Sequence, residues 1–185
     1  INNIMDLKIH DIEIKKKVFF VDTKWPHFKL LFEDIKKLSK NKNFKEILSL
    51  ERGGLYGNIS LFAPYFKKSN FVSVDCSTKQ IMKRGAYNKK FTKSDKIIKI
   101  PIDYNYNYKK IKIKKSSKNL IIIPNLIHHI FDHKILFSQC KNILKRNGQI
   151  YIFEPLIREL HQQPSDYFRF TPYGLKQILK DLGFN

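Results

Sequence analysis

The sequence has few cysteines, glycines and prolines, and it has no long apolar run. Two cysteines among 185 residues exclude a disulfide scaffold and a zinc site built from cysteines alone. Seven glycines and seven prolines are too few for a collagen-like or low-complexity chain. No stretch approaches the ~20 apolar residues of a membrane span, and the first residues do not form a charged-then-apolar leader. We therefore expect a cytoplasmic protein without a membrane span.

Arginine is also scarce, although the chain is strongly basic. The formal net charge is +20, but only five of the 36 basic residues are arginines and the other 31 are lysines. Phosphate and base recognition favours arginine, whose planar guanidinium offers a fork of donors. Abundant lysine, asparagine and isoleucine are more typical of an AT-biased coding sequence. We expect a small-molecule partner, and nucleic-acid binding stays an alternative that rests on charge alone.

Strand and helix patterns alternate along the chain. Helical spacing of apolar residues predicts helices over 27–38, 131–146 and 173–182, the second ending at a left-handed Asn147–Gly148. Apolar runs predict strands over 46–50, 70–75, 96–103, 119–124 and 149–153. Several runs lack two-residue alternation, which favours an α/β fold with a parallel sheet covered on both faces. Ligands bind at the carboxyl ends of such strands, so we expect the functional residues there.

Glycines and acids follow the first three predicted strands. Gly53, Gly54 and Gly57 would let a ligand approach the backbone, and a helix over 58–66 would direct its first amides at that ligand. Asp75 ends the second strand, where a carboxylate can accept hydrogen bonds from both ribose hydroxyls. Asp103 closes the third strand, placed to bind an adenine amine or to cap a turn. Together they favour a nucleoside-containing cofactor over a plain glycine turn with solvated acids.

Three histidines lie in residues 125–133, directly after the fourth strand. His129 and His133 are four residues apart and would share a helical face. No glutamate separates them as in a metalloprotease helix, and no distant third ligand stands out. We therefore expect no metal site, and we expect the histidines to line the floor of the site or to pack beneath it.

The segment after the fifth strand, residues 154–172, is dense in hydrogen-bonding side chains. It is placed where a substrate would approach, which makes its polar residues candidates for substrate binding. The alternative is a structural loop in which Asp166 pairs with Arg169. In either case Thr171 is expected to cap the last helix, with Pro172 at its first position.

These motifs resemble class I S-adenosylmethionine-dependent methyltransferases of the small-molecule type over residues 44–184. The resemblance is carried by residues 47–54 with Gly57, 72–75, 125–132 and 143–155, and residues 161–171 resemble one bacterial branch. It implies a Rossmann-like, doubly wound, mostly parallel sheet, with an N-terminal extension over 1–43 and a methyltransferase domain over 44–185. The family continues into an antiparallel hairpin, so we expect a domain that is incomplete after Phe184.

The resemblance also implies a role for each site residue. The expected S-adenosylmethionine-binding residues are Glu51, Gly53, Gly54, Gly57, Asp75, Cys76, Asp103, Asn125 and Leu126. The candidate general bases are His161 first, then His129 and His128, whose side chains titrate near neutrality. Arg158, Asp166, Tyr167 and Arg169 are the expected substrate-binding residues.

The sequence departs from the family at its first motif. Ser49 stands where the family has an acid, and Glu51 stands where it has the first glycine. We expect Glu51 to contact the cofactor's ammonium from its shifted position. An inactive or truncated relative that still binds the cofactor stays an alternative to the active methyltransferase.

Overall fold

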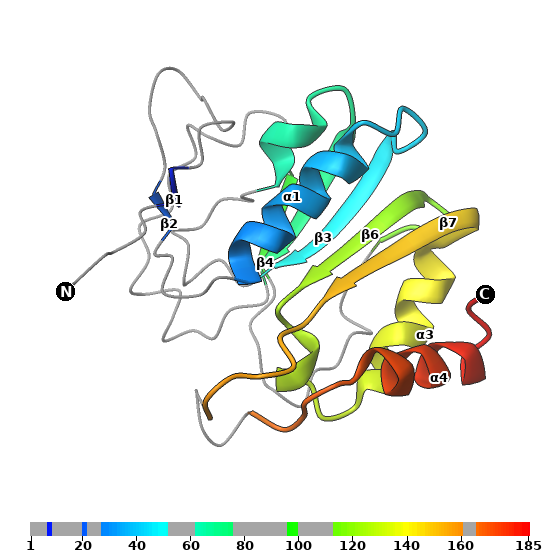
Figure 1. Ribbon diagram of the computed structural model, residues 1–185. Helices are drawn as coiled ribbons and strands as arrows, with labels where there is room; N and C mark the ends of the chain where they lie inside the picture. Colours follow the sequence, from blue (N-terminus) through cyan, green and yellow to red (C-terminus); the bar gives the residue numbers. More distant parts are fainter. Residues whose placement is uncertain are drawn as a thin grey trace.

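A five-stranded parallel sheet forms the centre of the protein (Figure 1). The computed structural model describes residues 7–8, 20–21, 27–51, 62–75, 96–99, 113–160 and 166–185. The strand order is β5-β4-β3-β6-β7, with bounds Lys96–Lys99, Asn70–Asp75, Glu46–Glu51, Lys118–Pro124 and Leu144–Phe153. A separate antiparallel pair joins β1 (Leu7–Lys8) to β2 (Phe20–Val21). The main sheet confirms the predicted Rossmann-like α/β fold.

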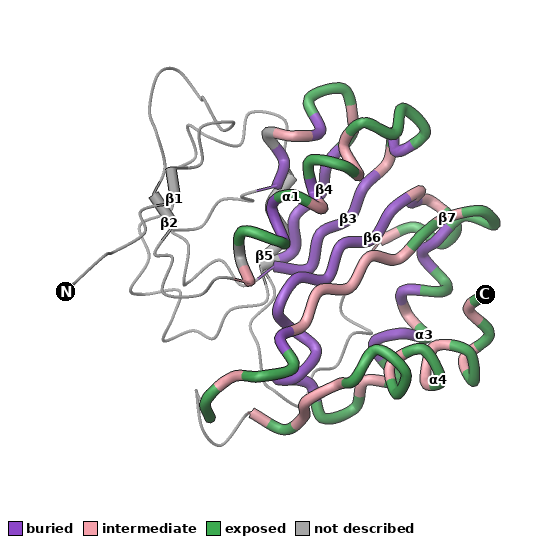
Figure 2. Tube along the Cα trace, viewed as in Figure 1, coloured by how far each residue is buried: buried purple, intermediate pink, exposed green. Residues whose placement is uncertain are grey.

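Each face of the sheet carries its own hydrophobic core. Helix α1 (His27–Ser39) and the 3-10 turn η2 (Ala63–Phe66) cover one face, where Ile47, Phe71 and Ile122 are buried. Helices α3 (His133–Ile143) and α4 (Pro172–Asp181) cover the other, where Leu48, Val72 and Ile121 are buried. Adjacent strand residues thus point to opposite faces and both faces are apolar, which explains the lack of polar alternation. Figure 2 shows β3 and β6 buried along their length.

Helix α1 is attached to the sheet by both apolar and polar contacts. Leu31 and Ile35 lie on its buried side, as the helical spacing predicts. The Tyr151 hydroxyl of β7 donates a hydrogen bond of 3.1 Å to Asp34 Oδ2 of the helix. Burial and the adjacent Asp34 carboxylate raise the pKa of Tyr151, so its hydroxyl stays protonated.

Three strands are joined at their amino ends by the side chain of Glu46. Its Oε2 lies 3.0 Å from Lys118 Nζ at the start of β6, and the Asn70 amide of β4 donates to both carboxylate oxygens. Burial alone would raise the pKa of Glu46, but the hydrogen bonds from Lys118 and Asn70 lower it overall. The Lys118 side chain is buried, so Glu46 balances a charge that water does not reach.

The helix predicted over 131–146 ends earlier than expected. Helix α3 stops at Ile143 because Leu144 adopts an extended conformation (φ −66°, ψ 140°), begins β7 and pairs with Lys118 of β6. The expectation of a left-handed Asn147–Gly148 stop is wrong, since both residues belong to β7 and only Gly183 has positive φ among the described glycines. Gly148 is needed for space instead: a Cβ there would lie 2.8 Å from Leu144 Cδ2 and 2.9 Å from the Lys118 carbonyl oxygen.

Two other predicted elements are described only in part. Strand β5 covers Lys96–Lys99, and residues 100–103 of the predicted strand lie outside the described residues. Of the helix predicted over 58–66, the described part forms the 3-10 turn η2, and residues 58–61 are outside it. Within the described ranges, no helix combines the length and apolarity needed to cross a bilayer.

The order of the strands determines where a ligand site can lie. Strands β4 and β5 follow β3 on one side of it, whereas β6 and β7 lie on the other, so the winding direction reverses between β3 and β6. Parallel α/β sheets bind their ligands outside the carboxyl ends of the strands at such a reversal. In this protein that edge carries Glu51, Asp75, Asn125 and Glu154.

Candidate functional site

The chain turns sharply where β6 ends. Asn125 adopts a left-handed backbone conformation (φ 53°), which asparagine tolerates better than most side chains. Its backbone N–H donates to the Phe153 carbonyl oxygen of β7 at 2.6 Å, and its Oδ1 accepts from Arg158 Nη1 at 3.3 Å. This turn directs the chain into the 3-10 helix η5 (Ile127–His129), which lies at the carboxyl edge of the sheet.

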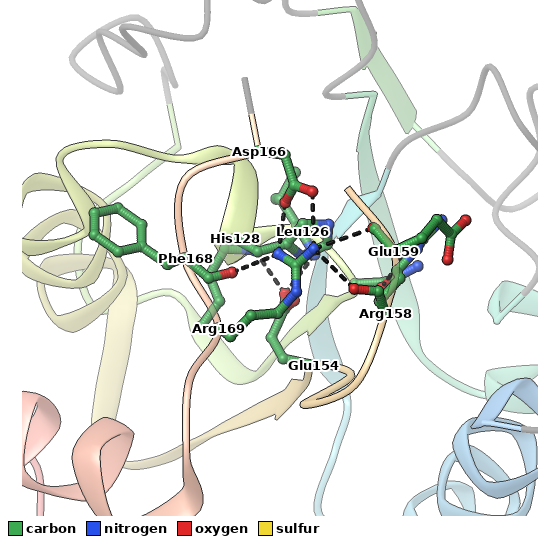
Figure 3. Close-up of polar contacts among 10 residues, drawn as sticks. Leu126, His128, Glu154, Arg158, Glu159, Asp166, Phe168 and Arg169 are labelled. Atoms are coloured by element: carbon green, nitrogen blue, oxygen red, sulfur yellow. Dashed lines mark hydrogen bonds and ion pairs between the residues drawn. The ribbon is translucent and has the colours of Figure 1, made fainter. Parts of the chain in front are cut away.

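Glu154, the residue after β7, caps that short helix. Its Oε1 accepts from the backbone N–H groups of Leu126 at 2.5 Å and Ile127 at 2.6 Å, and its Oε2 bonds to His128 Nδ1 (Figure 3). The Glu154 side chain is only 4% exposed. A carboxylate that accepts two amide bonds is an acceptor toward the histidine as well, so His128 carries its proton on Nδ1. Nε2 is then the basic nitrogen of the ring.

The two adjacent histidines of η5 are both buried. The ring centroids of His128 and His129 lie 3.9 Å apart. The backbone carbonyl of His128 accepts from the N–H of Tyr167 at 2.9 Å and that of Phe168 at 3.3 Å. These bonds attach the segment after β7 to η5, although about 40 residues separate them in the sequence.

Arg169 connects several residues of the segment after β7 through its hydrogen bonds. Its Nη1 and Nη2 donate to Asp166 Oδ1 and Oδ2 at 2.6 and 2.8 Å, which is the pair expected from the alternative interpretation of this segment as a structural loop. It also donates to the carbonyl oxygens of Phe168 at 2.8 Å and Glu159 at 3.2 Å (Figure 3). The hydrogen bonds to Asp166 raise the pKa of Arg169. These contacts give Arg169 a structural function, and its binding to a substrate stays a prediction.

The start of the last helix follows the sequence pattern. The Thr171 hydroxyl accepts from the Gly174 N–H at 3.1 Å, and Pro172 occupies the first helical position. Both predicted roles are confirmed. The capped helix begins at Pro172, shortly after Arg169, and packs against the core through Leu175 and Ile178, which fixes the position of this segment relative to the sheet.

Asp166 completes a cluster with the two histidines. One ring nitrogen of His128, one of His129 and a carboxylate oxygen of Asp166 lie within 4.8 Å of one another. The Asp166 side chain is 1% exposed. Residue spacing did not indicate this third group, because Asp166 lies 37 positions after His129. The structure brings it there through the backbone bonds to His128.

Two further histidines lie near this edge and have lowered pKa values. His27, at the start of α1, stacks on Phe153 with ring centroids 6.1 Å apart; burial and then the Arg158 charge lower its pKa. His133 meets Phe168 edge-on, and its burial lowers its pKa as well. Both rings therefore favour the neutral form in the folded protein.

The carboxyl ends of β3 and β4 place two acids side by side. Glu51 is the register partner of Asp75, and its buried carboxylate accepts from Ser73 Oγ at 3.0 Å. Ser49, which stands where the family has an acid, is fully buried, and its hydroxyl has no hydrogen-bond partner among the described atoms. The contact of Glu51 with a cofactor stays a prediction.

The structure brings together many of the predicted site residues. The described ones at the edge formed by β6 and β7 are Asn125, Leu126, His128, His129, Arg158, Asp166, Tyr167 and Arg169. Gly53, Gly54, Gly57, Cys76, Asp103 and His161 lie outside the described residues. Glu154 was not among the predicted site residues. An acid at the end of a strand was the available signal, the same one that identified Asp75.

The comparisons with known proteins come from structure alone, since no protein-family model and no curated protein matches the chain. A proposed methyltransferase of Bacillus halodurans superposes with a TM-score of 0.61 at 15% identity, covering 83% of this chain and 68% of that one. A SAM-dependent methyltransferase of Aquifex aeolicus gives 0.58 at 16% identity, covering 88% and 90%. Phosphoethanolamine N-methyltransferase 2 of Haemonchus contortus, bound to phosphomonomethylethanolamine and S-adenosylhomocysteine, gives 0.59 at 18%, covering 85% and 37%. The chain therefore has the Rossmann-like fold of class I S-adenosylmethionine-dependent methyltransferases.

Proposed function

We propose that the protein transfers a methyl group from S-adenosylmethionine to a small-molecule acceptor. The observation that carries this proposal is that β4 and β6 flank β3 next to the strand-order reversal. Glu51 and Asp75 end β3 and β4 there, and Asn125 follows β6. The structural neighbours named above support it, because they share the fold of this chain and one of them is bound to S-adenosylhomocysteine.

The chemistry of the residues at this edge fits the cofactor. A nucleoside with a ribose and an ammonium group needs carboxylate acceptors, and β3 and β4 supply Glu51 and Asp75 in register. In the proposal Asp75 binds the ribose hydroxyls, Glu51 faces the ammonium, and Gly53, Gly54 and Gly57 leave room for the backbone to approach. The cofactor supplies an activated methyl group, and the protein aligns the acceptor with it.

The acceptor's proton has a candidate recipient in His128. Its Nδ1 is bound to Glu154, so Nε2 is the ring nitrogen that would accept a proton from an oxygen or nitrogen nucleophile. General-base help of this kind contributes about 10²–10⁴-fold to a rate. His129 and His161 stay the other predicted candidates for this role.

Cofactor binding can be tested before the acceptor is known. We expect S-adenosylhomocysteine to raise the melting temperature of the protein and to give a one-to-one isotherm in titration calorimetry. Asp75→Ala should weaken binding by about tenfold or more, the loss of at least about 1.4 kcal/mol. Asp181→Ala, at the exposed end of α4, is the matched control and should bind normally.

The outcomes separate the proposal from its alternatives. Absence of binding by the folded wild-type protein contradicts a cofactor site at this edge. Binding without transfer of a labelled methyl group to any of a broad panel of alcohols, amines and acids would favour the inactive relative. Transfer to one acceptor class, with turnover lost in His128→Gln while cofactor affinity is kept, would support the proposed base.

A further inference from the structure

We propose that His128, His129 and Asp166 bind a divalent transition-metal ion at the carboxyl edge of β6 and β7. The three groups offer two imidazole nitrogens and one carboxylate oxygen within 4.8 Å of one another. A set of two histidines and one carboxylate is a recurring ligand arrangement for zinc and for non-haem iron(II). The site does not depend on methyl transfer.

The burial of the cluster favours a ligand site over a chance grouping of surface side chains. Both histidines are buried, and the Asp166 carboxylate is 1% exposed although it is charged. Metal–nitrogen bonds of about 2.0 Å require the three ligand atoms to lie about 3.3 Å apart in a tetrahedral site. The three ligand atoms lie within 4.8 Å of one another, so the bound ion would have to draw them closer together.

The groups behind the three ligands are those that metal sites use to orient their ligands. Glu154 bonds to His128 Nδ1, so Nε2 is the nitrogen that would coordinate, and its tautomer is fixed. Arg169 holds both oxygens of Asp166, at 2.6 and 2.8 Å, and so fixes the plane of that carboxylate. Arg169 also offsets the negative charge of Asp166.

The ligand types determine which ions fit. Two imidazoles and one carboxylate suit Zn²⁺, Co²⁺ or Fe²⁺, whereas Mg²⁺ and Ca²⁺ prefer oxygen ligands throughout. We infer an ion of the first group, with its remaining positions open to water or to an oxygen of a bound molecule. His128 Nε2 cannot coordinate an ion and accept a proton at the same time, so metal binding and the general-base function proposed above exclude each other at this nitrogen.

The test is metal binding by the full chain, purified without a histidine tag and stripped with a chelator. We expect one equivalent of Zn²⁺ in titration calorimetry and, with Co²⁺, a visible absorption band of a low-coordinate nitrogen and oxygen site. Mg²⁺ should give no isotherm. His129→Gln and Asp166→Asn should each weaken Zn²⁺ binding by more than about tenfold, and Glu154→Gln by about 10–100-fold through the orientation of His128.

His133→Gln is the matched control, since it removes a half-buried histidine that lies outside the cluster. It should bind Zn²⁺ with unchanged affinity. Thermal melts establish that each variant folds, and Asp166→Asn, which keeps one oxygen toward Arg169, carries the test if His129→Gln does not fold. No stoichiometric Zn²⁺ or Co²⁺ binding at micromolar free ion overturns the proposal, as does binding that survives both His129→Gln and Asp166→Asn.

Discussion

Replacing Glu154 by glutamine tests the arrangement at the end of β7 with minimal change of shape. The carboxylate accepts two backbone hydrogen bonds and one from His128, all shielded from water. Hydrogen bonds to a charged group contribute about 1.5–3 kcal/mol each, against about 0.5–1.5 kcal/mol for neutral pairs. Weakening the two bonds to Leu126 and Ile127 by about 1 kcal/mol each predicts a loss of about 2 kcal/mol in the free energy of unfolding.

The same substitution should move a proton on His128. If the new glutamine keeps its oxygen toward the two backbone amides, its NH₂ group faces His128 Nδ1, which must then accept rather than donate. The proton therefore moves to Nε2, which must lose it again before this nitrogen can accept a proton or coordinate an ion. Urea denaturation measures the stability change, and ¹⁵N chemical shifts of the imidazole report which nitrogen is protonated.

Glu154→Leu is the companion variant, because it removes the acceptor of three buried donors. Each buried donor left without an acceptor lowers the free energy of unfolding by about 1–3 kcal/mol, so this variant should be much less stable than Glu154→Gln. The reasoning is refuted if Glu154→Gln unfolds at the wild-type urea concentration and His128 still carries its proton on Nδ1. That result would mean that Glu154 does not control the tautomer.

Three further predictions concern the stability of the fold. Glu46→Gln should lower the free energy of unfolding by about 1–3 kcal/mol in urea denaturation, because it removes the carboxylate that balances the buried Lys118 ammonium; no change would contradict this. Gly148→Ala should cost about 1–3 kcal/mol through its contact with the Lys118 carbonyl, and a neutral effect would show that β7 adjusts. His27 and His133 have folded-state pKa values below 6.5, so the unfolded chain binds protons more readily and stability should decline as the pH falls through that value. Urea midpoints between about pH 8 and about pH 5 measure the decline, which should flatten in the double glutamine variant of these histidines.

Strands β3, β4 and β6 were predicted well because they consist largely of consecutive apolar residues, whereas β7 begins at Leu144 and not at residue 149 as predicted. Strand β4 has the predicted bounds, and β3 and β6 each differ by one residue, since the two apolar cores require both faces of these strands to be hydrophobic. The end of α3 was predicted wrongly because helical spacing continues past Ile143. Leu144 pairs with Lys118 in the sheet instead, and such a partner is not visible in local periodicity.

The site was predicted in part for a related reason. Asn125 and the histidines were identified because they follow a strand directly. The meeting of Asp166 with His128 depends on backbone bonds between segments far apart in the chain, and the capping function of Glu154 depends on the left-handed turn at Asn125. Neither feature leaves a periodic pattern in the sequence, so residue type and spacing alone do not reveal it.

The hydrogen bond from Tyr151 to Asp34 gives the protein a natural optical reporter. Burial and the neighbouring Asp34 carboxylate raise the pKa of Tyr151, so its phenolate absorbance should emerge late in an alkaline titration. Since Asp34 lies on α1 and Tyr151 on the edge strand β7, that late ultraviolet signal would mark the moment at which the first helix comes away from the last strand.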